Sequence, residues 1–274
     1  MPELPEVETI RRDLDAVLLE QIFSRVEIIY PGPVRPLSAE QFAEKLAGKK
    51  IISTGRRGKY LLLNLDDGSV IAFHLRMTGR LVFARQECAR DKHTHLVFHF
   101  ADGSCLTFSD VRKFGTIWLL STGGADQIPG LSALGPEPLS GDFHFPYLDR
   151  ALEKRAVSVK ALLLDQRVVA GLGNIYADEV LHRACIRPER KARSLGREER
   201  IVLFLAIREV LEEAISCRGT TVSDYRDASG SSGMFQERLR VYGRRGELCS
   251  RCGEVICRSC VAGRGTYYCP RCQK

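Results

Sequence analysis

The chain has 274 residues, of which 44% are hydrophobic, so it can bury sizeable cores and its length favours about two domains. It contains no apolar run of about 18 residues and no apolar signal core at its N-terminus, so we expect a soluble, cytoplasmic protein without membrane contacts. The net charge of +7 is uneven, because residues 241–274 hold seven Lys or Arg against two acids, whereas residues 1–20 hold two against six. A basic end favours a polyanionic partner over a membrane.

The first eight residues, MPELPEVE, are suited to chemistry by the chain's own terminal amine. If Met1 is removed, which a small second residue permits, Pro2 becomes a free secondary amine with carboxylates nearby on Glu3 and Glu6. A secondary amine that condenses with a sugar aldehyde gives an iminium cation, an electron sink for β-elimination, and the two carboxylates could donate or shuttle protons. The alternative is an ordinary amphipathic helix with acidic residues in its first turn.

Apolar residues at helical spacing follow this motif, and Pro5 suits a first helical turn, where its missing N–H costs nothing. We therefore expect a helix that begins about one turn after Pro2. Its positive end would face the terminal amine and lower the pKa of that amine, so that more of it is free base at neutral pH.

Residues 21–120 alternate apolar and polar side chains with a period of two in the runs RVEIIY, KIISTGRRGKYLLLNL, SVIAFHLRMTGRLVF, THLVFHF and SCLTFSDVRKFGTIWLL. The pattern predicts a sheet-rich domain, expected as a two-layer sandwich with the first helix packed on it. His93 and His95 lie two residues apart, but no set of Cys or carboxylate partners accompanies them. A phosphate contact or plain surface is therefore favoured over a metal site.

Residues 121–150 hold four of the eleven prolines, which predicts a linker, with a hinge at 135–149. From about residue 150 the pattern becomes helical, in the segments SVKALLLDQRVVAG, NIYADEVLHRA and IVLFLAIREVLEEAIS. Between the first two, the turn Gly171-Leu172-Gly173-Asn174 allows close approach of the backbone, and the following helix N-terminus can hold a phosphate, although most such turns only join helices. Residues 227–233 are polar and rich in Gly and Ser, so we expect this loop to be mobile until a ligand orders it.

Ten cysteines would be unusual for a disulfide scaffold of this size, and six of them fall within residues 249–272, which indicates metal binding. Cys249 and Cys252, sixteen residues, then Cys269 and Cys272 fit the paired knuckles of a four-cysteine zinc ribbon with one structural Zn²⁺. The competing pair, Cys257 and Cys260, is only four residues from Cys252, too few for the hairpin between knuckles, so we interpret these two as spare thiols.

The segments PELPEVET, RRGKYLL, HLRMTGR, KHTH, DVRKFG, LGPEPL, DQRVVAGLGNIYADE and VAGRGTYYCPRCQK together resemble the bacterial formamidopyrimidine-DNA glycosylases, in the family's order from Met1 to Lys274. The resemblance implies a bifunctional enzyme that removes oxidised purines, chiefly 8-oxoguanine opposite cytosine and formamidopyrimidines, and cuts the abasic strand by β,δ-elimination. We expect a monomer that acts on damaged double-stranded DNA in base excision repair, in the bacterial cytoplasm and nucleoid-associated through DNA.

The implied fold is α+β and multidomain. An N-terminal catalytic β-sandwich with a flanking helix would span residues 1–134 and be followed by the hinge at 135–149. A helix-two-turn-helix domain with a lesion loop would span 150–240, and a four-cysteine zinc ribbon 241–274. DNA would lie in the cleft between the domains.

Carried over by position, the resemblance makes Pro2 the Schiff-base nucleophile and Glu3 the proton donor, with Glu6 assisting. It assigns Lys59 to β-elimination, and Arg264 to δ-elimination and to the phosphate beside the lesion. The residues expected to contact DNA are Met77, His93, Arg112, Phe114, Arg155 and Asn174. Among these, Met77, Arg112 and Phe114 would fill the hole left when the damaged nucleotide is flipped out, with Arg112 at the unpaired base. Taken alone, Met77 would be interpreted as a core residue, Arg112 as a surface residue and Phe114 as a core residue.

Some positions depart from the family pattern. Thr78 stands where some relatives carry an acidic residue, which bears on the lesion pocket, and Cys257 and Cys260 are unusual. Two alternatives remain at this point. One is an endonuclease VIII type glycosylase for oxidised pyrimidines, against which Leu4 and the run Arg112-Lys113-Phe114 argue. The other is a non-catalytic zinc-ribbon protein that binds nucleic acid, which the intact Pro2-Glu3 terminus disfavours.

Overall fold

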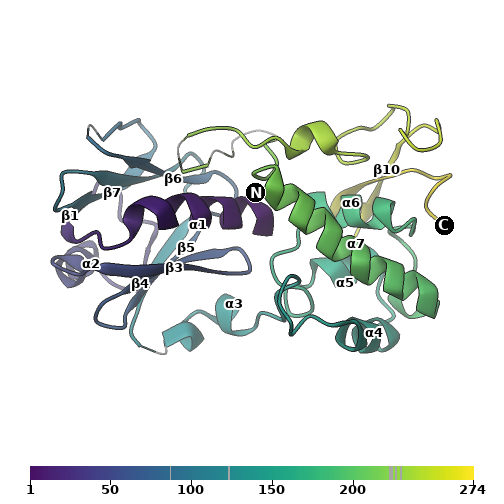
Figure 1. The fold of residues 1–274 in the computed structure, drawn as a ribbon, viewed down its shortest axis with the longest axis horizontal. Coiled ribbons are helices and arrows are strands. Elements are labelled where there is room, and N and C mark those ends of the chain that lie inside the picture. The colour runs from purple at the N-terminus through teal and green to yellow at the C-terminus, as the bar shows by residue number, and fades with distance from the viewer. Residues whose placement is uncertain (87, 123, 222–224, 226, 229) are drawn as a thin grey trace. The chain divides into compact units, whose positions relative to one another are not determined.

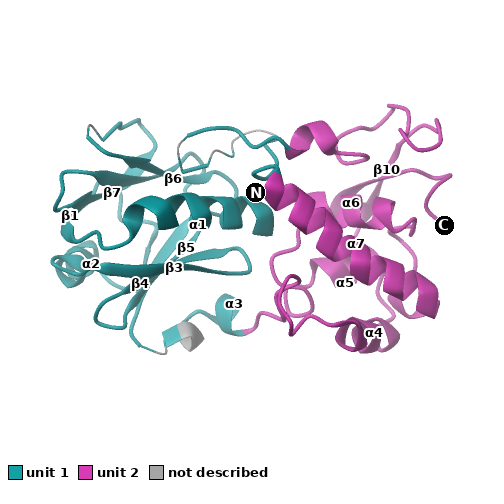
Figure 2. Cartoon of the chain, viewed as in Figure 1, with its two compact units in different colours: residues 1–132, 217–234 teal, residues 133–216, 235–274 magenta. Residues whose placement is uncertain are grey.

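The computed structural model spans residues 1–274 and describes all of them except 87, 123, 222–224, 226 and 229, and the side chains of 125 and 126. The chain divides into two compact units (Figure 2). Unit 1 contains residues 1–132 and 217–234, and unit 2 contains residues 133–216 and 235–274. The segment 217–234, which the sequence predictions grouped with the helical domain, therefore belongs to the N-terminal unit in this division.

Unit 1 is built on two sheets, as the alternating sequence pattern predicted (Figure 1). One sheet has the order β1-β7-β8-β6 and is antiparallel, with β1 at Phe23–Ile28, β7 at Thr94–Phe100, β8 at Cys105–Asp110 and β6 at Gly79–Ala84. The other has the order β2-β9-β5-β4-β3, with β2 at Val34–Arg35, β9 at Thr116–Leu120, β5 at Val70–His74, β4 at Tyr60–Leu65 and β3 at Ile51–Arg57. Only β2 and β9 pair in parallel among these described strands.

Helix α1 (Leu4–Leu18) packs into the core that the two sheets share. Its buried face places Val7, Ile10 and Leu14 in the same apolar cluster as residues of both sheets, because they recur at the helical period. The helix begins only two residues after Pro2, with Glu3 as its N-cap, rather than a full turn later as expected. Because so few residues precede the helix, Glu3 and Glu6 lie together at its N-terminus. Unit 1 also contains α2 (Ala39–Leu46), η1 (Gly124–Gln127) and α3 (Pro129–Ser132).

Unit 2 is helical and ends in a small β-hairpin. Its helices are α4 (Phe145–Glu153), α5 (Val159–Leu164), α6 (Asn174–Arg183) and α7 (Arg197–Ser216), with the 3-10 turns η2 (Ala192–Ser194) and η3 (Phe235–Arg238). The hairpin pairs β10 (Cys257–Val261) with β11 (Arg264–Tyr268). Among the described residues, none of the helices combines the length and apolar character that crossing a membrane would require.

Two of the predicted helix boundaries in unit 2 were wrong. Helix α4 begins inside the segment expected to be a hinge, where His144 caps it by accepting a hydrogen bond from the N–H of Tyr147. Helix α5 was expected to run on through residue 171 but ends at Leu164. It stops because the carboxylate of Asp165 accepts the backbone N–H of Arg167 at 3.1 Å, which replaces the helical bond with a turn.

Candidate functional site

The start of α1 gathers the residues predicted to carry the chemistry. Pro2 is buried, and Glu3 and Glu6 are 2% and 1% exposed. The carboxylate of Glu6 accepts two backbone N–H groups, that of Glu3 at 2.7 Å on Oε2 and that of Thr220 at 2.7 Å on Oε1. A buried carboxylate that is satisfied in this way is fixed in position. Glu6 thus holds the chain terminus against a segment more than 200 residues away.

The segment around Thr220 is a part of this site that the sequence analysis did not identify. Gly219 has a φ of +77°, and a Cβ there would lie 2.8 Å from Oε1 of Glu6, so only glycine fits. A Cβ on Gly233 would lie 2.3 Å from the carbonyl oxygen of Gly219. The two glycines were the available signal, but nothing in the sequence indicated that they face the N-terminus.

The predicted mobile loop 227–233 falls partly in this region, and residue 229 lies outside the described residues. Asp227 is 1% exposed, and its carboxylate binds the guanidinium of Arg218 at 2.6 Å and accepts the N–H of Ser231 at 2.8 Å. The described part of the loop is therefore anchored at Asp227. That the loop moves until a ligand orders it stays a prediction.

Lys59 lies in the turn between β3 and β4, where Gly58 has a φ of +56°. Lys59 is only 8% exposed, and such burial is rare for a lysine. The nearby His74 is also buried. Burial, together with the charges of Arg76 and Lys59, lowers the pKa of His74 to about 3, so this imidazole is neutral at physiological pH.

Met77, Arg112 and Phe114 lie together, as the resemblance implied. Nη1 of Arg112 is 2.9 Å from Sδ of Met77, and its guanidinium carbon lies 4.9 Å from the centroid of the Phe114 ring. Met77 is 41% and Phe114 52% exposed, so neither is a core residue. Exposed apolar side chains gathered around a guanidinium form a patch that can be inserted into another molecule.

Asp110 is the buried residue that shapes this patch, and the sequence analysis missed it. Its carboxylate accepts hydrogen bonds from the Thr78 hydroxyl, from the N–H of Arg112 at 3.2 Å and from the N–H of Gly115 at 2.7 Å. Thr78 Oγ1 also accepts the N–H of Arg112 at 3.0 Å. The turn after β5, which carries Met77, is thus joined to the turn after β8. Thr78, which departs from the family pattern, is a support of the patch here and is 6% exposed.

His93 and His95 have different environments. His95 is 3% exposed, and its Nε2 lies 2.8 Å from the carbonyl oxygen of Asp110, so it is a structural residue behind the same turn. His93 is half-buried, and its backbone N–H donates to Oδ1 of Asp91 at 2.7 Å. Among the described residues, neither histidine belongs to a cluster that could hold a metal ion.

In unit 2, Asn174 is the first residue of α6 and joins that helix to the hairpin. Its Nδ2 donates to the carbonyl oxygen of Gly265 at 3.0 Å, directly beside Arg264 at the start of β11. Its Oδ1 is buried and has no hydrogen-bond partner among the residues that the structure describes. The helix start that the sequence indicated is therefore fixed to the hairpin at the residue after the arginine predicted to bind phosphate.

A buried ion pair supports the same hairpin and was not foreseen. Lys160 and Asp178 are both fully buried, with Nζ and Oδ1 2.7 Å apart. Lys160 also donates to Oγ1 of Thr266 at 2.8 Å, and Asp178 accepts the N–H of Tyr267 at 2.9 Å. Breaking such a pair by removing one partner leaves an uncompensated buried charge. In the sequence, Lys160 is one more polar residue in a helical pattern, and no local signal distinguishes it.

Arg155 forms an ion pair with Asp165 at 2.8 Å and is 38% exposed, and its contact with the DNA backbone stays a prediction. Arg167 binds the same carboxylate at 2.9 Å, and its hydrogen bond is the main reason that the pKa of Asp165 is well below its usual value. Arg155 is thus engaged within unit 2.

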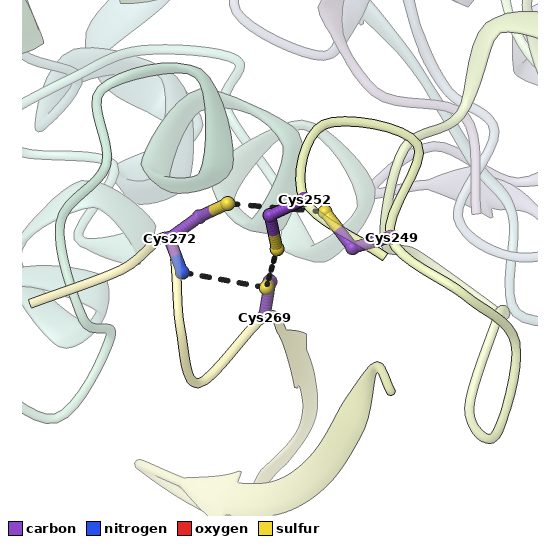
Figure 3. A group of neighbouring side chains, drawn as sticks. All are labelled: Cys249, Cys252, Cys269 and Cys272. Atoms are coloured by element: carbon purple, nitrogen blue, oxygen red, sulfur yellow. Dashed lines mark hydrogen bonds between the residues drawn. The ribbon is translucent and has the colours of Figure 1, made fainter. Parts of the chain in front are cut away.

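Cys249, Cys252, Cys269 and Cys272 form one cluster, as predicted (Figure 3). All four sulfur atoms lie within 4.8 Å of one another, with Sγ–Sγ distances of 3.5 Å for Cys252 and Cys269 and 3.9 Å for Cys249 and Cys272. Tetrahedral Zn–S bonds of about 2.3 Å would separate the sulfurs by about 3.8 Å. The cluster can therefore hold a metal ion.

The remaining cysteines lie outside this cluster. Cys257 and Cys260 are on β10 and are free thiols, in agreement with the interpretation of them as spare. Cys88 and Cys105 form a disulfide that the sequence analysis did not predict. Within the cluster itself, burial raises the pKa of Cys269 and Cys272, whereas a hydrogen bond from the backbone of Glu254 lowers that of Cys252 to about 7. A bound dication would favour the thiolate form of all four.

Comparison with known proteins agrees with this arrangement. Residues 1–117 match the formamidopyrimidine-DNA glycosylase N-terminal domain and residues 134–226 match the H2TH domain of the same enzymes. The formamidopyrimidine-DNA glycosylase of Pelotomaculum thermopropionicum is 50% identical over 274 residues, which cover 100% of this chain and 99% of the relative. That of Heliobacterium modesticaldum is 50% identical and covers 100% of both chains.

Solved structures of the Lactococcus lactis Fpg are similar as well. One complex with DNA that contains an abasic site superposes with a TM-score of 0.92 at 42% identity and covers 99% of both chains. Another, with DNA that contains Fapy-dG, has a TM-score of 0.92 at 42% identity and covers 99% of this chain and 100% of that one. Identity of this level over the full length leaves one conclusion: the chain belongs to the formamidopyrimidine-DNA glycosylase family.

Proposed function

We propose that the chain excises oxidised purines from duplex DNA and then cuts the strand, as a bifunctional DNA glycosylase and AP lyase. The observation that carries this proposal is the start of α1, where Glu6 holds the N–H of Glu3 and that of Thr220 at 2.7 Å each. Once Met1 is removed, the Pro2 amine would start the chain beside the two buried carboxylates of Glu3 and Glu6, which are the parts for covalent catalysis. The full-length similarity of the chain to DNA-bound relatives supports the substrate class.

In the proposed reaction, Met1 has been removed and the secondary amine of Pro2 attacks C1′ of the damaged nucleotide. The new C–N bond forms as the bond to the base breaks, and Glu3 supplies the proton that allows the sugar ring to open. The resulting iminium acidifies C2′, and loss of that proton expels the 3′-phosphate. Lys59, in the buried turn after β3, is proposed to assist this step. Arg264 is proposed to hold the phosphate and to serve the second, δ-elimination.

We further propose that the four-cysteine cluster holds one structural Zn²⁺, which would fix the hairpin that carries Arg264. The thiolate donors, their number and their spacing suit this ion. Asn174, His93 and Arg155 are proposed as contacts to the DNA backbone. The protein is proposed to act as a monomer in the bacterial cytoplasm, on DNA of the nucleoid.

Borohydride trapping tests this function directly. We expect one covalent adduct when the protein is incubated with borohydride and a duplex that contains a single 8-oxoguanine opposite cytosine, because reduction of the iminium makes the bond permanent. A matched duplex with undamaged guanine is the control and should give none. A protein that binds the damaged duplex but yields no adduct would be the non-catalytic binding protein instead.

Replacing Arg112 by Ala is expected to erase much of the preference for cytosine opposite the lesion. A guanidinium supplies paired donors that match the acceptors of an orphaned cytosine, and a good base contact is worth roughly 1–3 kcal/mol, or about one to two powers of ten. The measurement is single-turnover excision of 8-oxoguanine opposite each of the four bases. Met77→Ala and Phe114→Ala are matched controls from the same patch, which should slow excision without changing the preferred base. An unchanged preference in Arg112→Ala would make this arginine one more phosphate contact.

The salt dependence of DNA binding should distinguish the charged contact of Arg264 from the neutral contact of Asn174. Arg264→Ala should weaken binding to every duplex and reduce the slope of log K against log salt by about one, because one cation no longer displaces counterions. Asn174→Ala should weaken binding with the slope unchanged, since it removes a neutral contact. Titration of a duplex from low to moderate salt measures both. Equal slopes for Arg264→Ala and the unmodified protein would remove Arg264 from the phosphate contacts.

A further inference from the structure

Unit 2 contains a pocket of about 350 Å³ that none of the proposed DNA contacts lines. Its walls come from the last two turns of α6, from α7, from η3 and from the first cysteine knuckle. The α6 residues in its wall, from Glu179 to Arg183, lie about 7 to 14 Å farther along the helix than Asn174 at 1.5 Å per residue. The pocket is thus distinct from the end of α6 that contacts Gly265.

The lining of this pocket is strongly cationic. It contains the four arginines Arg183, Arg238, Arg240 and Arg251, against one carboxylate, Glu179. Arg183 and Arg238 are compensated, because both bind Glu213, at 2.6 and 3.1 Å, and Arg183 also lies 3.5 Å from Glu209. The other two arginines decide what the pocket can bind.

Arg240 and Arg251 make only neutral contacts. Nη1 of Arg240 donates to the hydroxyl of Ser250 at 3.4 Å, and Nη1 of Arg251 donates to the carbonyl oxygen of His182 at 3.4 Å and meets Sγ of Cys185. Within the described parts of the chain, neither forms an ion pair with a carboxylate. Each guanidinium carries five N–H donors, so most of them remain for a ligand.

Among the described residues, Glu179 forms no ion pair with Arg240 or Arg251, although the charge of Arg240 is attracted to its carboxylate. Its carboxylate accepts the backbone N–H groups of Arg240 at 2.8 Å, Val241 at 3.0 Å and Tyr242 at 2.9 Å. Its oxygens are therefore occupied, and they fix the backbone that presents the Arg240 side chain. Burial raises the pKa of Glu179 above its usual value, while the three N–H bonds and the charge of Arg240 act in the opposite direction.

We propose that this pocket binds the phosphate monoester of a ligand about the size of a nucleotide, with Arg240 and Arg251 on the phosphate. A guanidinium binds phosphate oxygens through two parallel N–H bonds, which is the recognition that arginine performs best. Val210 and Phe235 give the pocket an apolar wall beside the cations. Its volume is near the lower end of small-molecule sites.

Calorimetric titration of the full-length, metal-loaded protein with dGMP tests the proposal. A parallel titration with inorganic phosphate shows whether the free anion binds as well as the nucleotide does. Deoxyguanosine lacks the phosphate and should not bind. Arg240→Gln and Arg251→Gln should each raise the dissociation constant for dGMP about tenfold or more, because each removes a charge-assisted contact. Arg193→Gln, at an exposed arginine of η2 in the same unit, is the matched control and should bind as the unmodified protein does.

Arg251 neighbours a cysteine of the metal cluster, so metal content is measured in each variant, and Arg240→Gln alone carries the test if Arg251→Gln loses metal. Tighter binding of dGMP than of phosphate would assign the apolar wall to the base and uphold the proposal, whereas equal binding would leave a site for a free anion and overturn the nucleotide-sized ligand. Failure of dGMP and phosphate to bind at millimolar concentration, or equal binding by Arg240→Gln and Arg193→Gln, would overturn it. Lesion-duplex binding that is unchanged in Arg240→Gln shows that the loss does not come from the DNA site.

Discussion

Retention of Met1, or one extra residue ahead of Pro2, is expected to abolish borohydride trapping and strand cleavage while DNA binding is largely kept. An added residue converts the secondary amine into an amide nitrogen, which is neither basic nor nucleophilic, so the iminium cannot form. Met1 is itself accommodated in the structure, at 49% exposed, so the loss is expected from the chemistry of the nitrogen and not from misfolding of the chain start. Loss of the covalent step is expected to be complete, because no other group in the sequence supplies a terminal secondary amine.

Mass spectrometry of the trapped and digested adduct gives the sharper readout. The adduct should map to the N-terminal peptide and to Pro2 within it. Lys59→Ala is the control at the other candidate amine, and it should still be trapped because Lys59 is assigned to elimination and not to attack. An adduct at Lys59, or trapping that survives an N-terminal extension, would contradict the assignment of Pro2.

The sheets, the main helices and the cysteine cluster could be predicted because their signals are local. Alternation with a period of two identifies strands, and apolar positions such as Val7, Ile10 and Leu14 identify the buried face of α1. The spacing of the cysteines fixes which four can meet around one metal ion. Pro2, Glu3 and Glu6 were visible for the same reason, since their relation to one another depends on one helical turn.

The supports of the site could not be predicted, because they depend on contacts between distant segments. Glu6 meets Thr220, and Thr78 meets Asp110, and no local pattern in the sequence pairs them. The C-terminus of α5 was predicted wrongly for a similar reason over a shorter distance. The helical pattern continues past Leu164, but the hydrogen bond from the N–H of Arg167 to the Asp165 carboxylate forms a turn there. Such residues hold other residues in place, and a resemblance to known motifs does not identify them by itself.

Replacing Cys269 by Ser is expected to release the metal and to abolish excision. Cys269 is fully buried, and its sulfur lies 3.5 Å from that of Cys252, so a serine there removes one of four ligands at the centre of the cluster. Structural zinc contributes about 10–16 kcal/mol to the folding of zinc-finger peptides at neutral pH. The two knuckles flank the β10–β11 hairpin, so loss of the metal should free Arg264 as well. Metal released by chelation and single-turnover excision are measured together.

The double variant Cys257→Ser and Cys260→Ser is the matched control, because it removes the same number of thiols as a whole knuckle from the same ribbon. Neither thiol belongs to the cluster, so one metal ion per chain and full excision are expected. If the double variant loses the metal while Cys269→Ser retains it, the ligand set is wrong. If Cys269→Ser loses the metal but still excises 8-oxoguanine at the unmodified rate, the ligand set is right but the hairpin does not need the ion to position Arg264. The buried Lys160–Asp178 pair and the bond from Asn174 to Gly265 would then be sufficient to hold that arginine.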